Sequence, residues 1–470
     1  MIEGWSIGIN GKKHTKNMPF EKILKFLIGL FLFLLPWQTI WIFREVFVGG
    51  VKREYLTLGF YATEVLLWIV IMMFIAWYWK NYKLQITNYK FRMTKDRVFV
   101  LSVLSLISYL LLSLIWSSDK SLVLQQSLHI LEAFLLFFIL WLGPLKKEEA
   151  IKWLVLGSIL PCVLGIWQFL AQSTFASTWL GLALHPTWQG GTSVVASETI
   201  GRWLRAYGPF SHPNVFGGYL AIVLLLYCSI VKEEKRWLQL ITYNLLLTTL
   251  FFTFSRSAWI VVFIGLLVYW FTVKNEKKWL QLTTYNLLLT IFLATLFFPL
   301  VQTRLTGNSI SESHSITDRV SGYSDAWKLF KQHPVLGVGA GNYAIALWHS
   351  DKWRSVWEIQ PAHNAAVLFV VEGGVIGVAL FVFVLISFVK LIIQTTKHKF
   401  YYGLCYLGFV FLALFDHYLY SSYIGLMLSS LFFALISRRN GENTVSPQLI
   451  HRESFDIPFA ACHNTPTRLR

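Results

Sequence analysis

The sequence reads Gly337-Val338-Gly339-Ala340-Gly341-Asn342-Tyr343 near the end of a long polar stretch that separates two strongly apolar segments. This stretch runs from about residue 302 to residue 360 and is closed by Pro361-Ala362-His363-Asn364. It also contains Arg304 and the run Asp318-Arg319-Val320-Ser321-Gly322-Tyr323. The flanking segments are long and apolar enough to span a membrane. We therefore expect the polar stretch to supply half of an active site at a membrane surface.

The composition is that of an integral membrane protein. Hydrophobic residues make up 55% of the 470 residues and charged residues only 14%, whereas a soluble domain needs roughly 25% charged residues. The net charge of +17 would indicate nucleic acid binding in a soluble protein. Here the basic residues stand in short clusters between apolar runs, so membrane lipid headgroups explain them and no nucleic acid partner is expected. The four cysteines show neither metal-ligand nor paired spacing.

Apolar runs predict an all-α polytopic membrane protein with about twelve transmembrane helices. The first run, residues 23–43, has no cleavage pattern after it and is interpreted as an uncleaved helix rather than a signal peptide. The other spans are expected near residues 57–79, 98–117, 122–143, 150–171, 215–231, 237–254, 258–273, 279–300, 364–389, 403–419 and 421–437.

The basic residues predict the orientation of these spans. With the N-terminus in the cytoplasm, 28 of the 41 Lys and Arg residues fall in cytoplasmic segments, and each such segment holds at least three. Both termini are then cytoplasmic, and the two long loops, 172–214 and 302–362, face outward. The domain organisation follows: an N-terminal bundle of five spans (1–171), a core with the outer loops (172–380), C-terminal spans (381–437) and a polar, disordered tail (438–470).

Two local patterns complete the architecture. The sequence around Thr242-Tyr243-Asn244-Leu245-Leu246-Leu247 recurs at Thr284-Tyr285-Asn286-Leu287-Leu288-Leu289, which indicates that one helix is used twice in the same direction. In the second outer loop, Tyr323, Ala326, Trp327 and Phe330 have helical spacing. This spacing predicts an amphipathic helix over residues 321–332, lying on the membrane.

Arginines at the membrane edge are the main candidate site residues. Arg256 sits in a very short polar gap between two apolar runs, with no acidic neighbour. It is poised to hold an anion, although an arginine that only binds lipid phosphate would look the same. Arg202 and Arg205 lead into a loop that ends His212-Pro213-Asn214, where helix capping is the simpler role of His212 and Asn214. A salt bridge with Asp318 is the alternative role of Arg319.

The remaining candidates lie at the end of the polar stretch. His363 stands at the start of a span, where the helix dipole disfavours a charged ring and leaves the neutral ring able to accept a proton. Glu372 is a carboxylate inside a span, and it is either functional or orients a neighbour. The glycine run at 337–341 favours a tight turn over a phosphate cradle, because the Gly-Lys-Ser/Thr ending of a nucleotide loop is missing. No Asp-x-Asp occurs, so neither a metal nor a cofactor is expected.

The ordered set of motifs resembles the O-antigen ligase and O-antigen polymerase superfamily. It consists of Arg205-Ala-Tyr-Gly-Pro-Phe with His212-Pro-Asn, Phe254-Ser-Arg256-Ser-Ala-Trp, Arg319 before a helix, Pro334-Val-Leu-Gly-Val-Gly-Ala-Gly-Asn-Tyr343, and His363-Asn followed by Glu372-Gly-Gly-x-Ile-Gly377. The resemblance covers about residues 200–380.

The resemblance implies a metal-independent glycosyltransferase in a bacterial inner membrane. Its donor would be a glycan on undecaprenyl or another polyprenyl diphosphate, and its acceptor a hydroxyl on a glycan, lipid or protein. By match to the family motifs, Arg256 and Arg319 would hold the diphosphate and His363 would act near the acceptor hydroxyl, with Arg202, Arg205, Arg304 and Glu372 as further substrate-binding candidates. Ligase, polysaccharide polymerase and protein O-oligosaccharyltransferase remain open. A lipid-linked glycan transporter is the alternative from another class, and its candidate buried ionisable residues are Glu64, His129 and Glu132.

The predicted orientation is testable by cysteine labelling. In a variant without the native cysteines, Ser311→Cys should react from outside intact cells with a membrane-impermeant thiol reagent, because residue 311 lies in an outer loop. Asn440→Cys should react only after the cells are opened. The reverse pattern, measured by mass shift on a gel, would contradict both the orientation and the outward-facing site.

Overall fold

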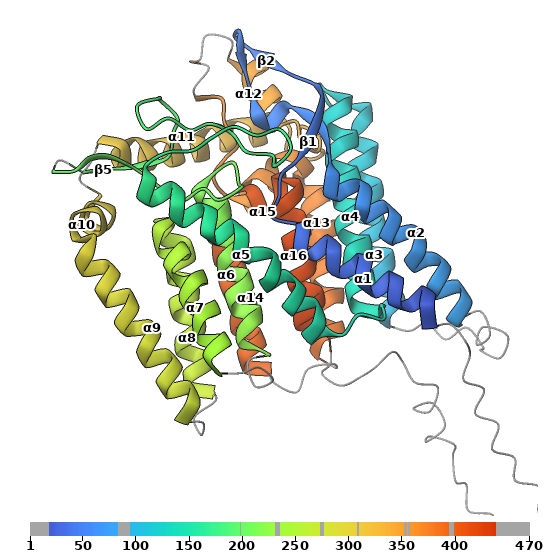
Figure 1. Cartoon of the computed structure of the whole chain (residues 1–470). Helices are drawn as coiled ribbons and strands as arrows, with labels where there is room; N and C mark the ends of the chain where they lie inside the picture. Colours follow the sequence, from blue (N-terminus) through green and yellow to red (C-terminus); the bar gives the residue numbers. More distant parts are fainter. Residues whose placement is uncertain are drawn as a thin grey trace, which may run out of the picture.

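The computed structural model describes residues 18–82, 95–197, 199–230, 236–272, 277–307, 310–351, 355, 358–393 and 399–438. The predicted disordered tail, apart from Arg438, lies outside these residues. The described chain is mostly helical with little strand, as expected (Figure 1). Its long helices are α1 (Met18–Leu34), α2 (Ala62–Tyr82), α3 (Lys95–Leu112), α4 (Lys120–Leu142), α5 (Lys147–Ala171), α6 (Pro213–Cys228), α7 (Arg236–Phe252), α8 (Arg256–Thr272), α9 (Lys277–Leu296), α11 (Ile310–Gln332), α13 (Ala365–Ile393), α14 (Lys399–Phe415) and α16 (Tyr423–Ser437).

Each predicted span overlaps one of these helices, with α11 lying in the predicted outer loop. Among the described residues, 5 helices are long and apolar enough to cross a membrane by themselves, namely α2, α3, α4, α5 and α13. A sixth crossing arises if α9 and α10 (Phe298–Thr306), which meet at 89°, form one broken span. The other apolar helices are shorter. The chain is therefore an integral membrane protein, while the number of twelve crossings stays a prediction.

The first predicted span is shorter than expected. Helix α1 ends at Leu34, just before Pro36, whose ring cannot continue a helix. The β-branched and aromatic residues that follow form strand β1 (Ile40–Arg44), which pairs antiparallel with β4 (Leu58–Tyr61). The hydropathy of this segment was sufficient for a span, but its proline and its side-chain types favour a strand.

The remaining short elements gather at one end of the helix bundle, which we call the site end (Figure 1). They are β2 (Phe47–Val48), β3 (Val51–Lys52), η1 (Glu54–Leu56), η3 (Ser113–Ile115), β5 (Val194–Ser197), β6 (Gly201–Leu204), α10, α12 (Tyr343–Ser350) and α15 (Tyr418–Ser421). Both predicted outer loops are thus on the same end. Helix α11 begins earlier than the predicted residue 321, buries Ala326 and Leu329, and leaves Tyr323 and Trp327 exposed.

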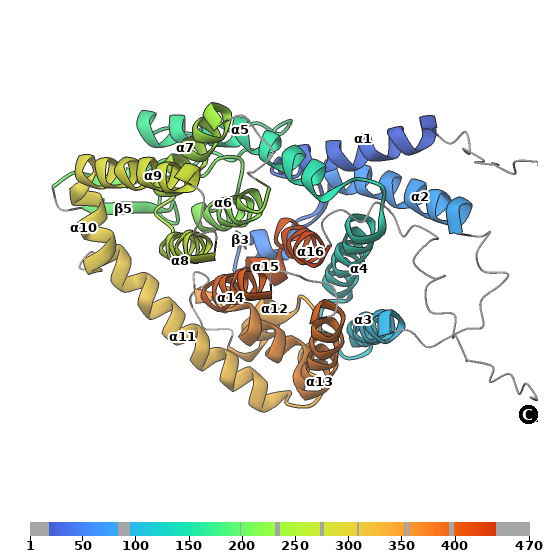
Figure 2. The ribbon, with the colours of Figure 1, turned by 90° about the horizontal axis from the view of Figure 1, so that it is seen from below.

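Helices from the different predicted domains pack against one another. Helix α16 packs against α4 and α6, and α13 packs against α3 (Figure 2). Arg438, just after α16, donates hydrogen bonds to the carbonyl oxygens of Leu140, Gly143 and Leu145 in the turn between α4 and α5. Because α4 begins at the site end, this turn lies at the opposite end. Helix α13 also continues through residue 380, where the sequence predicted a domain boundary.

A kink in α13 holds the glycine turn at residues 337–341. At Gly374 the backbone has φ 59° and ψ −169°, a conformation essentially restricted to glycine. The kink exposes carbonyl groups of α13, and the amides of Val338 and Gly339 donate to Val371 O and Glu372 O, both at 3.0 Å. The buried Glu372 carboxylate accepts from Gly341 N at 2.9 Å and from the hydroxyl of Tyr420 at 2.8 Å.

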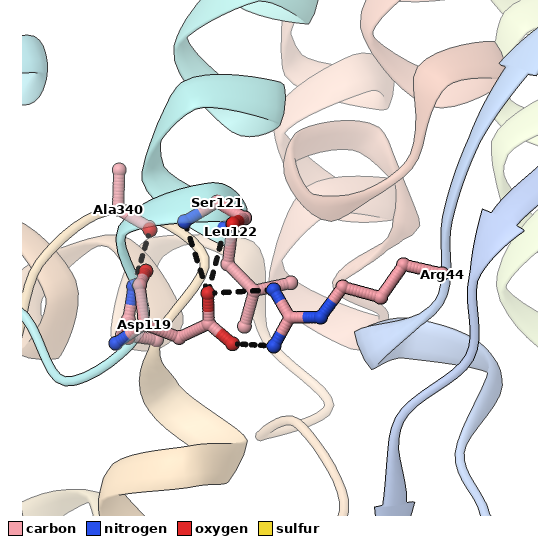
Figure 3. Close-up of polar contacts among 6 residues, drawn as sticks. Arg44, Asp119, Ser121, Leu122 and Ala340 are labelled. Carbon is pink, nitrogen blue, oxygen red and sulfur yellow. Dashed lines mark hydrogen bonds and ion pairs between the residues drawn. The ribbon is translucent and has the colours of Figure 1, made fainter.

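The next residue of the turn, Asn342, joins it to the start of α4. Its amide Nδ2 donates to Asp119 O at 3.1 Å and to Ala340 O at 3.0 Å, while its Oδ1 accepts from Asp119 N at 2.8 Å. The Asp119 carboxylate caps α4 through Ser121 N and Leu122 N and forms a two-point ion pair with Arg44, the last residue of strand β1 (Figure 3). The Arg44 contact contributes to lowering the Asp119 pKa, although burial alone would raise it. Strand, helix and turn are thereby fixed to one another.

The kink predicts a sharp difference between two neighbouring glycines. A Cβ atom at residue 374 would lie 2.4 Å from Val335 O and would force a side chain into a glycine conformation, whereas one at residue 373 would come no closer than 3.6 Å to Phe369. Gly374→Ala should therefore destabilise the protein by about 1–3 kcal/mol or more, and Gly373→Ala should be nearly neutral. Thermal unfolding of both variants in detergent measures the difference; equal midpoints would contradict this account of the kink.

Candidate functional site

The turn between α7 and α8 fixes the position of Arg256. Phe254 has a left-handed backbone with φ 48°, which is rare for a bulky residue. Its fully buried ring packs against Phe169, Phe251 and Trp259, so aromatic packing stabilises this strained turn. The chain then starts α8 at Arg256, which is half-buried.

Three of the predicted arginines meet in one cavity of about 210 Å³, which we call the arginine cavity. It is lined by Asn214, Ser255, Arg256, Ser257, Ile260, Arg304, Arg319, Phe411 and Phe415. Arg256 Nη1 donates to Arg304 O at 3.1 Å, and Arg304 Nε donates to Phe254 O at 2.9 Å. The cavity is polar on the arginine side and apolar along Ile260, Phe411 and Phe415. None of the described residues that line it is acidic.

Two donor groups in this cavity lack a protein acceptor. The Nε atom of Arg319 and the Oγ atom of Ser255 are both buried and have no hydrogen-bond partner among the described residues. Asp318 therefore does not hold the Arg319 Nε atom, which disfavours the salt-bridge interpretation. Buried donors without a partner are costly, so this arrangement is suited to an anion with several oxygen atoms.

Arg205 is brought close to the cavity but is engaged by the protein. It is 3% exposed, and its Nε, Nη1 and Nη2 atoms donate to Thr253 O, Ser193 Oγ and Asn214 Oδ1, each at 2.6 Å. Arg202 is exposed on β6 and donates to Thr187 O and Gln189 O. Neither arginine lines the cavity. Glu372 does not line it either, since its carboxylate holds the glycine turn.

His363 belongs to a cluster that joins the cavity through Asn214. Its Nδ1 atom lies 3.7 Å from Asp416 Oδ1, at the distance of an ion pair rather than of a short hydrogen bond. Asn214, which lines the cavity, donates through Nδ2 to Asp416 Oδ2 at 3.2 Å. The rings of His363 and His417 are 5.5 Å apart. Asp416 thus connects the histidine to the wall of the cavity.

Two further histidines, His212 and His417, lie near His363. Burial lowers the pKa of His417 to about 4, and burial together with the charge of Arg205 lowers the pKa of His212 to about 3, so both are neutral at pH 7. His212 accepts a hydrogen bond from Asn214 N at 3.0 Å and caps α6, as the simpler interpretation expected. Burial alone would raise the pKa of Asp416, but His363 and then His417 outweigh it and hold this pKa below its ordinary value.

Sequence reasoning missed Asp416, Asn214 and Ser255 as members of this site. Asp416-His417 interrupts an apolar run, and that interruption was the available signal. His363, Asp416 and His417 also have donor atoms within 4.8 Å of one another, so they have the side-chain types that could hold a metal ion. The four amides from Val338 to Gly341 donate to protein oxygens, two of them to Ser113 Oγ and Glu372, which leaves none for a phosphate.

A comparison with known protein families gives a match to part of the chain. No curated protein matches the chain. Residues 241–382 match the family model described as O-Antigen ligase, a range that contains Arg256, Arg304, Arg319 and His363. This match confirms the resemblance to the O-antigen ligase superfamily over these residues.

Proposed function

We propose that this protein is a glycosyltransferase of the bacterial inner membrane. It transfers a glycan from a polyprenyl diphosphate, such as undecaprenyl diphosphate, to an acceptor hydroxyl at the outer face. The observation that carries the proposal is the arginine cavity, in which three guanidinium groups from three segments meet beside an apolar wall. Such a cavity suits a ligand that is anionic at one end and hydrocarbon at the other. A lipid-linked diphosphate has this form.

The size of the cavity limits what it recognises. A water molecule occupies about 30 Å³ of liquid volume, so the cavity of 210 Å³ has the volume of about seven water molecules. This volume suits a diphosphate-sized group rather than an oligosaccharide. Ile260, Phe411 and Phe415 offer contacts for the first part of the lipid chain. The glycan must then extend out of the cavity, toward the elements of the site end.

The three arginines suit a glycosyl transfer in which a diphosphate is the leaving group. The acceptor hydroxyl attacks the anomeric carbon, the bond between that carbon and the phosphate oxygen breaks, and the diphosphate leaves with the electron pair. Arg256, Arg304 and Arg319 stabilise the charge that develops on the leaving oxygen, as preorganised cations do in a site that excludes water. Ser255 Oγ and Arg319 Nε supply the donors that the protein itself leaves unused.

His363 takes the proton from the acceptor hydroxyl as a general base. Asp416 faces Nδ1 of this ring and stabilises the charge that the ring acquires when it accepts the proton. Asp416 is therefore a positioning residue, and Arg205 acts further out by fixing Asn214, which in turn contacts Asp416. These roles require no metal ion.

The three alternatives within the family, ligase, polymerase and protein O-oligosaccharyltransferase, differ in the acceptor. Ligation to lipid A core, extension of a polysaccharide and glycosylation of a protein would all use the same donor half of the site. The long polar loops of the site end are suited to hold such an acceptor, whereas the transporter alternative predicts short loops.

The proposal is tested by product release. Purified protein in liposomes should release free polyprenyl diphosphate from a polyprenyl-diphosphate-linked glycan, in step with glycan appearing on the acceptor. The matched control is the same glycan on a polyprenyl monophosphate, which offers the arginines less charge and should react far more slowly. Movement of intact donor across the bilayer without release of the diphosphate would support the transporter instead.

Arg256 should be sensitive to a change that keeps its charge. Arg256→Ala should weaken donor binding about 10- to 100-fold, because a hydrogen bond to a charged group is worth roughly 1.5–3 kcal/mol. Arg256→Lys should also lose most activity, since an ammonium group lacks the planar fork of the guanidinium. Donor affinity and turnover are measured beside Lys328→Ala, which removes an exposed charge from α11 outside the cavity. Near-normal turnover of Arg256→Lys would make Arg256 a generic lipid anchor.

His363 and Asp416 should act on the rate rather than on donor binding. His363→Gln should lower kcat about 10²–10⁴-fold, because the amide cannot accept the proton, and donor affinity should stay unchanged. Asp416→Asn should also lower kcat and should alter the pH dependence of the rate, which a purely structural change would leave in place. Rates measured from pH 5 to 9 check both. Parent-like turnover of His363→Gln would place the base elsewhere.

A further inference from the structure

A second polar cluster lies among the helices of the N-terminal half. The three isolated ionisable residues that the sequence shows there, Glu64, His129 and Glu132, are brought together by the fold. Each offers one donor atom, and these atoms all lie within 4.8 Å of one another. Glu64 is in the first turn of α2, and His129 and Glu132 are on one face of α4. None of them lines the arginine cavity.

The cluster is deeply buried and carries acidic charge. Glu64, His129 and Glu132 are 1%, 6% and 0% exposed. His129 Nε2 lies 3.8 Å from Glu64 Oε2. The carboxylates of Glu64 and Glu132 offer oxygen atoms within 4.8 Å of each other, and two buried carboxylates this close cannot both remain ionised unless positive charge compensates them. The cluster therefore requires a bound cation or protons.

Half of the carboxylate oxygens are held by the protein and half are not. Glu132 Oε1 accepts from Trp68 Nε1 at 2.6 Å, and Glu64 Oε2 accepts from the amide of Tyr61 at 3.1 Å. These contacts fix the orientation of both carboxylates, as outer contacts do around metal ligands. Glu64 Oε1 and Glu132 Oε2 are buried and have no hydrogen-bond partner among the described residues.

Neutral oxygen atoms surround the same place. The hydroxyls of Thr63 and Tyr423, which interact with each other, are also buried at this place. Thr63 precedes Glu64, and the Tyr423 ring lies 5.3 Å from that of His129 and stacks on Tyr61 at 4.6 Å. Two carboxylate oxygen atoms without a hydrogen-bond partner, beside an imidazole and two hydroxyl groups, are the surroundings that a small cation needs.

We propose that Glu64, His129 and Glu132 bind a divalent first-row transition metal ion of the Zn²⁺ or Mn²⁺ class, which joins α2 to α4. The donor set selects this class, because Mg²⁺ and Ca²⁺ prefer oxygen ligands alone, whereas an imidazole suits transition metals. A doubly charged ion neutralises both carboxylates. Ligands about 2.1 Å from a tetrahedral ion are about 3.4 Å apart; the distance from His129 to Glu64 is 3.8 Å, and all three donor atoms lie within 4.8 Å of one another, so closure around an ion needs side-chain shifts of about 1 Å. The ion is structural and takes no part in the proposed transfer.

Metal content of the purified full-length protein tests this site. After incubation with Zn²⁺ or Mn²⁺ and gel filtration into metal-free buffer, mass spectrometry should find about one ion per chain, and the ion should raise the midpoint of thermal unfolding. The variant Glu64→Gln/Glu132→Gln keeps the side-chain sizes and removes the buried charges, so it should fold. Its bound metal should fall about 10-fold or more, with no rise in the midpoint on metal addition.

A control separates this cluster from the one at His363. Asp416→Asn disrupts the other group of possible metal ligands and should leave the metal content unchanged. Loss of the metal in Asp416→Asn, or its retention in the double glutamine variant, would place the ion elsewhere and overturn the proposal. Parent protein that retains neither ion would overturn it as well and would assign the compensation of the two carboxylates to protons.

Discussion

The three hydrogen bonds of the buried Arg205 guanidinium determine how the parts of the candidate site meet. They join the loop before β5, the turn before α8 and the start of α6, through Ser193, Thr253 and Asn214. A buried cation is costly unless its donors are satisfied, and here all three nitrogens reach oxygen atoms. Because Asn214 also contacts Asp416, the same guanidinium influences the surroundings of His363. Arg205 is thus a positioning residue of the whole site.

The arginine cavity, unlike the surroundings of Arg205, brings three arginines together. Its cations face one another with no acidic side chain among the described residues that line it, and the turn that holds Arg256 contains the left-handed Phe254. Both features are unfavourable for the protein without a ligand, and functional sites are where such conflicts concentrate. The aromatic packing around Phe254 offsets the strain. The glycine run forms the tight turn that the sequence favoured, and together with the Glu372 carboxylate it contributes to stability by fixing α13 to α4.

The sequence was informative where the chemistry was rare. In a chain with so few charged residues, Arg256, Arg304, Arg319 and His363 stood out, and the structure brings the three arginines together. Arg205 and Arg256 are both arginines near the ends of apolar runs, so the sequence does not distinguish them. Only the packing shows that the Arg205 guanidinium is hydrogen-bonded within the protein and that Arg256 lines the cavity. Asp416 could not be connected to His363, because their contact depends on how α14 packs beside α6 and α8. Hydropathy predicted the positions of the apolar helices. It did not predict that α1 ends before Pro36 or that α9 and α10 meet at 89°.

The repeated helix sequence has a geometric consequence. Helices α7 and α9 have 17 and 20 residues and run in the same direction, and each leads into a helix that carries an arginine of the cavity, Arg256 at the start of α8 and Arg304 in α10. At 1.5 Å per residue they are about 26 and 30 Å long, and both arginines line the same cavity at the site end. One residue more or less in either copy would shift its arginine by about 1.5 Å and turn it by about 100°. The cavity therefore constrains the lengths of these helices as well as the residues that follow them.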